Sequence, residues 1–406
     1  MRRTTRAILP ALVLAACTAK GPLGDPELPY ALPHEPQVGE IAHLPTGTYV
    51  DREALLEQVT QARVIYVGET HDNPASHRLQ LEILRHLQEN DPGGTALAME
   101  MFTPEQQPVL DRWIRGELSE REFLRQVGWF GNWRMNFGYY RPLLDFAREN
   151  RIPLIGINAP KKLVAAVSRT PIEELPEETL EQLPELDFSD PYQRALVAAV
   201  VGAHDSGRAM QDGFTRVQTL WDESMAENLA DYLRSSGGRG RQVVVVAGGN
   251  HVRFGFGIPR RLYRRLPTTY LLVGSREIEI PEDKRDRLMD VEMPRFPMLP
   301  YHFLAFTRYE DLPQPGVKLG VRMQEAERCV AVTAVLPGSA AERAGLRKGD
   351  ALCRLDRVEL NEPFDLSYEL QQKNREDEVV LAVERDGEAL EIEVDFADPG
   401  TVRDED

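Results

Sequence analysis

The sequence predicts an α/β fold: a mostly parallel sheet flanked by helices, with an inserted helical subdomain, followed by a small β-rich domain at the C-terminus. Short apolar runs rich in β-forming residues alternate with helical patterns, which is typical of βαβ units. An acidic, proline-punctuated stretch at about residues 171–211 interrupts this alternation, and short strand-like runs follow residue 316. The length of 406 residues also favours two domains.

Residues 1–17 have the composition of a secretory signal. Three arginines within the first six residues precede an apolar run at 7–16, which is too short to span a bilayer as a mature helix. The ending Leu-Ala-Ala-Cys resembles the bacterial lipobox, in which the cysteine carries the lipid. We therefore expect a lipid anchor on Cys17. Because Thr18 follows in place of an aspartate, the pattern resembles sorting to the outer membrane, facing the periplasm. The alternative is an ordinary signal peptide with an incidental cysteine.

The larger predicted domain spans residues 49–280 and follows a flexible tether at 18–48, which is rich in proline, glycine and polar residues. Asp51 is the expected cap of its first helix, and Asn73-Pro74 predicts the start of the next. Five short apolar runs predict buried strands of a parallel sheet, at 64–67, 96–99, 152–157, 243–246 and 268–273.

The C-terminal third has a different composition. Residues 281–315 are proline-rich and irregular, so we expect a linker there, followed by the β-rich domain at 316–396 and a disordered acidic tail at 397–406. Cys329 and Cys353 form either a disulfide or two buried free thiols. The formal net charge of −17 weighs against a nucleic-acid partner, because such binding depends on Lys and Arg contacts to phosphates.

Polar side chains follow the ends of the predicted strands, where open parallel sheets bind ligands. Asn158 and Asn250 lie at two of these ends. An inward-facing histidine is predicted in the first turn of the helix after Pro74. Taken singly, each of these polar residues has a structural explanation, but buried carboxylates and histidines are costly to cluster without a purpose. The sequence therefore predicts one site, built from Glu69, His71, His77, Glu100 and His251.

An aromatic, glycine-broken segment at 129–140 supplies a second part of the site. It includes Tyr140 and is basic at Arg134 and at the adjoining Arg141. It is suited to form a wall for a flat apolar ligand, with Arg available for carboxylates and Arg134 as the candidate contact. The alternative is a loop anchored by core aromatics. Asp222, within a long predicted helix, is either solvated or orients an Arg or His.

These motifs together resemble the ChaN-like family of haem-binding lipoproteins, which is related to the Tiki, TraB and erythromycin-esterase-like proteins. The resemblance covers about residues 44–273 and rests on the stretches 67–73 with His77, 98–101, 131–133, 140–143, 221–226 and 248–251. It implies haem binding connected with iron uptake, and it allows a homodimer. Haem iron accepts His or Tyr as an axial ligand, so Tyr140, His71, His77 and His251 are the candidates.

The related branches also imply an alternative, a hydrolase. In that reading His71 is the general base, Glu69 or Glu100 orients it or binds a metal, and His251 is its partner. Glu69, His71, Glu100 and His251 would then be the ligands of a divalent metal such as zinc or manganese. The sequence leaves open whether the protein is an enzyme, and a scaffold with a relic pocket is a third reading. The chain has no Gly-x-Ser-x-Gly elbow, which argues against a serine hydrolase.

Residues 316–396 resemble a bacterial PDZ domain, through the stretches 318–321, 335–341 and 344–350. The backbone N–H groups of Leu319, Gly320 and Val321 are the expected site for the carboxylate of a C-terminal peptide or protein partner. The helix around 364–371 would form the other wall of the groove. In the hydrolase reading this domain presents peptide substrate. The alternative is a PDZ-like module that only packs on the main domain.

Overall fold

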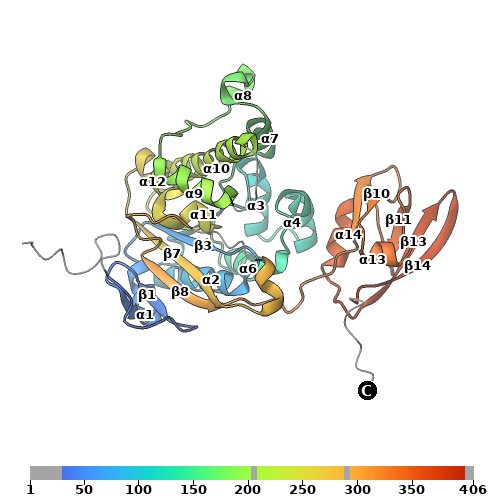
Figure 1. The fold of residues 1–406 in the computed structure, drawn as a ribbon, viewed down its shortest axis with the longest axis horizontal. Coiled ribbons are helices and arrows are strands. Elements are labelled where there is room, and N and C mark those ends of the chain that lie inside the picture. The colour runs from blue at the N-terminus through green and yellow to red at the C-terminus, as the bar shows by residue number, and fades with distance from the viewer. Residues whose placement is uncertain (1–29, 203–207, 288–292, 398–406) are drawn as a thin grey trace, which may run out of the picture.

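The computed structural model describes residues 30–202, 208–287 and 293–397. The predicted signal with Cys17, and the acidic tail from residue 398, lie outside the described residues. The chain forms a larger α/β domain and a smaller β-rich domain, which are joined by a single segment (Figure 1). The predicted fold class is therefore confirmed.

The larger domain is built on an eight-stranded sheet whose pairings from β8 to β5 are parallel. Strand β3 is central, pairing with β6 on one side and β7 on the other, and all of its residues are buried. The strands lie in the order β2 (Thr48–Val50), β1 (Ile41–His43), β8 (Phe303–Arg308), β7 (Tyr270–Glu279), β3 (Val64–Glu69), β6 (Gln242–Gly248), β4 (Thr95–Met99) and β5 (Leu154–Gly156).

Helices cover both faces of this sheet, because alternate residues of each strand point to opposite sides. Ile65 and Val67 pack into one core with α2, α3 and α6, whereas Val64 and Tyr66 pack into a second core with α10 and α12. The helices are α1 (Arg52–Val59), α2 (Pro74–Asn90), α3 (Gln107–Ile114), α4 (Glu120–Gln126), α5 (Trp129–Asn132), α6 (Arg141–Glu149), α7 (Lys161–Arg169), α8 (Glu177–Leu180), α9 (Pro191–Gly202), α10 (Arg208–Arg234), α11 (Gly249–Val252) and α12 (Ile258–Arg265). Within the described ranges, none of the helices has the length and apolarity to span a membrane.

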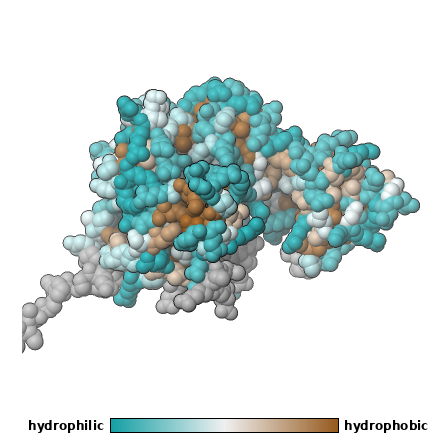
Figure 2. Space-filling model, turned by 90° about the horizontal axis from the view of Figure 1, so that it is seen from above, coloured by the Kyte–Doolittle hydropathy of each residue, from teal (hydrophilic) through white to brown (hydrophobic). Residues whose placement is uncertain are grey.

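The helix starts follow from local capping chemistry. The side chain of Asn73 accepts a hydrogen bond from the Ala75 N–H, and Pro74 occupies the first turn of α2. Asp51 caps α1 in the same way. The acidic stretch after α7 forms short helices, η3 (Ile172–Glu174), α8 and α9, before the long helix α10. An apolar patch surrounded by hydrophilic surface is visible on the face of this domain drawn in Figure 2.

Two predicted connections differ from the structure. Strands β1 and β2 begin within the expected tether at 18–48, and β8 lies within the expected linker at 281–315. Phe303 and Ala305 pack into one core of the larger domain, while Leu304 and Phe306 pack into the other. This segment is thus a sheet strand, paired with β7 and β1. The prolines at 294, 297 and 300 obscured the short apolar run that follows them.

The C-terminal domain is a sheet with its own hydrophobic core. Strand β9 lies at one edge of the order β14-β13-β11-β10-β9, so one side of β9 has no neighbouring strand in the described part of the chain. Its elements are β9 (Val321–Glu325), β10 (Val330–Val335), α13 (Ala340–Arg343), β11 (Ala351–Leu355), β12 (Val358–Glu359), α14 (Pro363–Leu370), β13 (Glu378–Arg385) and β14 (Glu388–Asp395). Cys329 and Cys353 form a disulfide, with Cα atoms 4.3 Å apart, which decides between the two alternatives that the sequence left open.

Helix α14 of the C-terminal domain packs against α4 and α5 of the larger domain (Figure 1). The buried carboxylate of Asp365 accepts hydrogen bonds from Arg121 at 2.6 Å and from Arg125 at 2.7 Å. The rings of Phe130 and Phe364 lie 5.4 Å apart beside these ion pairs. We call this set the α4–α14 contact. It holds the two domains together through both charge and apolar packing.

Replacing Asp365 by Ala should lower the free energy of unfolding of the C-terminal domain by about 2 kcal/mol. The change removes two charge-assisted hydrogen bonds to arginines and the acceptor for the N–H groups of Asn361 and Glu362 at the start of α14. Hydrogen exchange of amides in residues 316–396 measures this loss. Glu376→Ala, at an exposed position of the same domain, is the control. Equal protection in both variants would show that the α4–α14 contact contributes no stability.

Candidate functional site

A cavity of about 1750 Å³ lies at the carboxyl ends of the neighbouring strands β3, β6, β4 and β5. The polar residues at the ends of the predicted strands indicated a binding site at this edge of the sheet. The structure brings the carboxylates and histidines of these strand ends onto its lining: Glu69, His71, Glu100 and His251, together with Asn158 and Asn250. The histidines and carboxylates form two clusters, one around Glu69 and one around His251.

The carboxylate of Glu69 is the centre of the first cluster and is fully buried. Its Oε1 accepts hydrogen bonds from the Tyr140 hydroxyl and from His71 Nδ1, both at 2.8 Å. Its Oε2 accepts one from Gln80 Nε2 at 2.6 Å and lies 3.4 Å from His77 Nδ1. Burial raises the pKa of Glu69, but the charge of His77 and the hydrogen bond from His71 outweigh it, so the pKa falls below its ordinary value. Glu69 therefore acts as an ionised anchor for its neighbours.

His71 is the member of this cluster that reaches the cavity, with 37% of its side chain exposed. Burial lowers its pKa, but the hydrogen bond and charge of Glu69 outweigh that effect and raise it. A Cβ atom added to Gly248 would lie 2.9 Å from His71 Cε1 and 3.1 Å from Nε2, so the ring needs a glycine at that position. The Trp133 ring stands edge-on to the imidazole, with ring centroids 5.0 Å apart. No described residue forms a hydrogen bond with His71 Nε2.

His77 and Tyr140 lie beneath Glu69 rather than on the cavity lining. The Tyr140 hydroxyl is buried and donates to Glu69, and burial raises its pKa well above the ordinary value. His77 is 5% exposed; its Nε2 lies 3.1 Å from the carbonyl oxygen of His71, and its Nδ1 lies 3.1 Å from Gln80 Oε1. Both side chains therefore support the Glu69–His71 pair.

The cluster around His251 is a buried chain of charges. His251 Nδ1 lies 2.6 Å from Asp222 Oδ1, and its Nε2 lies 3.3 Å from Glu100 Oε1. The other oxygen of Glu100 accepts a hydrogen bond from the Gly248 N–H at 2.7 Å. Burial opposes the charged forms, but the mutual attraction outweighs it: the pKa of His251 rises to about 10 and that of Glu100 falls to about 2. Of the two roles predicted for Asp222, the structure shows that of orienting a histidine.

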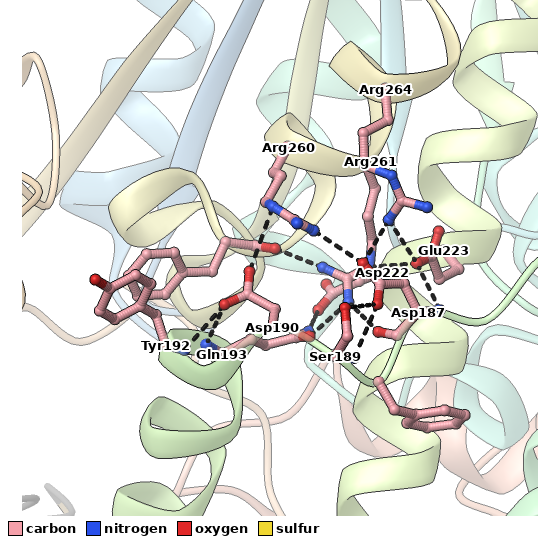
Figure 3. Close-up of polar contacts among 12 residues, drawn as sticks. Asp187, Ser189, Asp190, Tyr192, Gln193, Asp222, Glu223, Arg260, Arg261 and Arg264 are labelled. Carbon is pink, nitrogen blue, oxygen red and sulfur yellow. Dashed lines mark hydrogen bonds and ion pairs between the residues drawn. The ribbon is translucent and has the colours of Figure 1, made fainter.

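Side chains from α9 and α12 form a hydrogen-bonded network that holds the carboxylate of Asp222 in place (Figure 3). Gln193 donates to Asp222 Oδ2 at 2.7 Å, and its own amide oxygen accepts from Arg261 at 2.5 Å. Arg261 is fully buried and pairs with Glu223 at 3.0 Å. Gln193 and Arg261 lie far from Asp222 in sequence and carry no motif, so sequence reasoning missed them. The same is true of Gln80 beneath Glu69.

The Glu100–His251 pair predicts a pH-dependent stability of the larger domain. A carboxyl whose pKa falls from 4.5 to about 2 stabilises the fold above pH 4.5 and loses this contribution as the pH drops toward 2. A histidine whose pKa rises from 6.5 to about 10 stabilises it below pH 6.5 and loses this contribution as the pH rises toward 10. We expect a plateau between these limits and a decline on both sides, measured by urea unfolding across the range. A Glu100→Gln variant with an unchanged profile would contradict it.

The four residues predicted as metal ligands are engaged with one another and with neighbouring side chains. Both oxygens of Glu69 are engaged by Tyr140, His71 and Gln80, and both oxygens of Glu100 face Gly248 or His251. In the part of the chain that the structure describes, no three His, Cys, Asp or Glu side chains are arranged to hold a metal ion. Each of the two carboxylates has hydrogen-bond or ion-pair partners within the site, and zinc or manganese on these four residues stays a prediction.

The fold and the cavity define a class of protein: an α/β protein with a cavity at the carboxyl edge of its sheet, in which a buried carboxylate is hydrogen-bonded to a histidine that lines the cavity. Residues 55–262, more than half of the chain, match the family described as "Haem-binding uptake, Tiki superfamily, ChaN", and the chain belongs to this family. Residues 317–396 match the PDZ domain family, so the smaller domain is a PDZ domain.

Two known proteins illustrate these relationships. A structure titled "Cofacial heme binding to ChaN of Campylobacter jejuni" is 16% identical and superposes with a TM-score of 0.51, covering 67% of this chain and 97% of that chain. This likeness supports the fold. Protein RETICULATA-RELATED 5, chloroplastic, of Arabidopsis thaliana is 24% identical over 251 residues, which is 56% of this chain. The match spans 33% of the length of the Arabidopsis protein.

Proposed function

We propose that the protein binds haem in the cavity at the strand ends, with His71 Nε2 as the axial ligand. The main support for this proposal is the position of His71. Its ring is exposed to the cavity, while its Nδ1 is hydrogen-bonded to Glu69. The other candidates are occupied: Tyr140 and His77 are bound beneath Glu69, and both nitrogens of His251 face carboxylates. Haem would supply an iron that accepts a neutral imidazole nitrogen. The family description supports this choice of ligand.

The surrounding residues suit that role. A carboxylate that accepts the second N–H of an axial histidine fixes the ring and raises its basicity, which is the position of Glu69 here. Trp133 offers an aromatic edge beside the ligand. The cavity is larger than the roughly 300–1,000 Å³ typical of small-molecule sites, so it has room for a macrocycle. Arg134 is exposed beside Lys161, which lines the cavity, so this rim carries positive charge.

We further propose that the protein is a lipoprotein anchored through Cys17 to the bacterial outer membrane, facing the periplasm, where it serves iron acquisition or haem handling. The support is the lipobox-like ending at 14–17 and the family description. A disulfide between Cys329 and Cys353 is compatible with an oxidising compartment. Homodimer formation is proposed from the sequence resemblance alone.

The PDZ domain is proposed to bind the C-terminus of a peptide or protein partner. Among the described residues, no acceptor is bound to the backbone N–H of Leu319 or Gly320, and Val321 begins the edge strand β9. Free N–H groups beside an open strand edge suit a peptide carboxylate. The α4–α14 contact engages Phe364, Asp365 and Glu369 of α14, while Leu366 and Leu370 face the PDZ core. The domain therefore packs on its neighbour and still retains the features of a peptide groove.

A haem titration of the purified protein tests the proposal. We expect a saturable Soret shift with defined stoichiometry, and quenching of the fluorescence of Trp133 near the cavity. Metal analysis of the same untreated sample runs in parallel. Absence of a saturable shift, together with stoichiometric zinc or manganese, would overturn haem binding in favour of a metal protein.

A further inference from the structure

The side chain of Arg253 lines the same cavity on the flank opposite to Lys161. Arg253 follows α11, directly after the strand that delivers His251, and it lies near Tyr301. Tyr301 packs over Gly274 of strand β7, whereas Lys161 follows β5. In the sheet order β7-β3-β6-β4-β5, the strands that carry His71 and His251 lie between these flanks.

The guanidinium of Arg253 is only partly satisfied. Its Nη2 donates to Asn250 Oδ1 at 2.6 Å, and its Nε is buried with no hydrogen-bond partner. No carboxylate of the described residues lies within ion-pair distance of it. A buried donor without a partner is uncommon in folded proteins and calls for an explanation.

The arginines that follow along the chain behave differently. Arg260, Arg261 and Arg264 all form ion pairs with acidic residues (Figure 3). Arg253 lines the cavity and lacks the carboxylate partner that each of these three arginines has. An arginine presents several donors in a fixed fork, which matches the two oxygens of a carboxylate.

The backbone holds Arg253 in place. The next residue, Phe254, has a φ of 60°, which is rare for a residue with a bulky side chain. Its N–H donates to the carbonyl oxygen of Pro300 at 2.9 Å, and its ring stacks on Phe256 and packs edge-on against Phe296. A strained backbone held by such packing is typical of preorganised sites.

We propose that Arg253, oriented by Asn250, binds a carboxylate of the ligand and so selects an acidic tetrapyrrole. This inference rests on the proposed haem function and assigns the acidic edge of the ligand to the β7 flank. It differs from the prediction from sequence, which gave this role to Arg134. Arg134 lies near Lys161 on the other flank.

Three ligands and four variants test the assignment. Haem carries iron and carboxylates, protoporphyrin IX carries carboxylates without iron, and haem dimethyl ester carries iron without free carboxylates. Arg253→Gln should raise the Kd for haem and for protoporphyrin IX roughly tenfold, and leave the ester unchanged. His71→Ala should instead weaken the binding of haem and of the ester but not the binding of protoporphyrin IX. Arg253→Lys, which keeps the charge without the fork, should fall between wild type and Arg253→Gln.

The outcomes separate this inference from the proposed function. If Arg134→Gln rather than Arg253→Gln produces the carboxylate-dependent loss, the acidic edge faces the other flank and the inference is overturned while haem binding stands. If Arg253→Gln weakens all three ligands equally, Arg253 has only a structural role. If the wild-type protein binds none of the three, the function itself fails.

Discussion

His71→Ala is expected to abolish the coordination signature of bound haem, with the Soret maximum moving to that of a weakly bound, unligated species. Among the predicted ligands, His71 combines an exposed ring with an Nε2 that no described residue engages. The loss should exceed the roughly 10–100-fold that removal of a supporting residue costs a metal site. Titration of haem into the variant, followed at the Soret maximum, measures it.

The controls come from the same cluster. Glu69→Gln leaves the His71 ring in place but removes the charge that raises the pKa of His71. The variant should therefore weaken haem binding by about 10–100-fold without abolishing coordination. His77→Gln should have a smaller effect, because His77 contacts Glu69 and not the cavity. A Soret signature that survives in His71→Ala but vanishes in the His77 variant would reverse the assignment.

The location of the site could be predicted from the sequence, because two rules combine. Apolar β-forming runs identify the strands, and parallel strands place their carboxyl ends at one edge. Glu69 and Glu100 stand directly at such ends, so their convergence was predictable. The order among the axial candidates was not predictable. It depends on the hydrogen bond that buries the Tyr140 hydroxyl against Glu69, a contact between residues 71 positions apart.

The contacts that sequence missed have a common physical reason. Gln80 and Gln193 are neutral residues within ordinary helices. A pattern of hydrophobicity does not show that their amides donate hydrogen bonds to buried carboxylates. Strand β8 was missed because its run is short and follows closely spaced prolines. In both cases the deciding interaction is tertiary: the residue gains its role from a partner supplied by a distant segment.

The buried chain Asp222–His251–Glu100 should carry the largest stability effect in the larger domain. Asp222 is fully buried and accepts from His251, Gln193 and, at 3.4 Å, Gln218. Asp222→Ala removes the counter-charge on one side of the imidazolium and leaves both amides without their acceptor. Breaking a buried pair from one side typically costs about 3–5 kcal/mol. We therefore expect a loss of about that size in the free energy of unfolding.

Tryptophan fluorescence can follow this unfolding, and an exposed aspartate of the same helix provides the control. Its four tryptophans, at 113, 129, 133 and 221, all lie in the larger domain, so their fluorescence during urea unfolding reports that domain and not the PDZ domain. Asp231→Ala removes an exposed carboxylate from the same helix α10 and should change stability by less than about 0.5 kcal/mol. Asp222→Asn keeps an acceptor for the amides and should recover part of the loss. Equal stability of the Asp222→Ala and Asp231→Ala variants would contradict the prediction and show that the buried chain contributes no net stability to the larger domain.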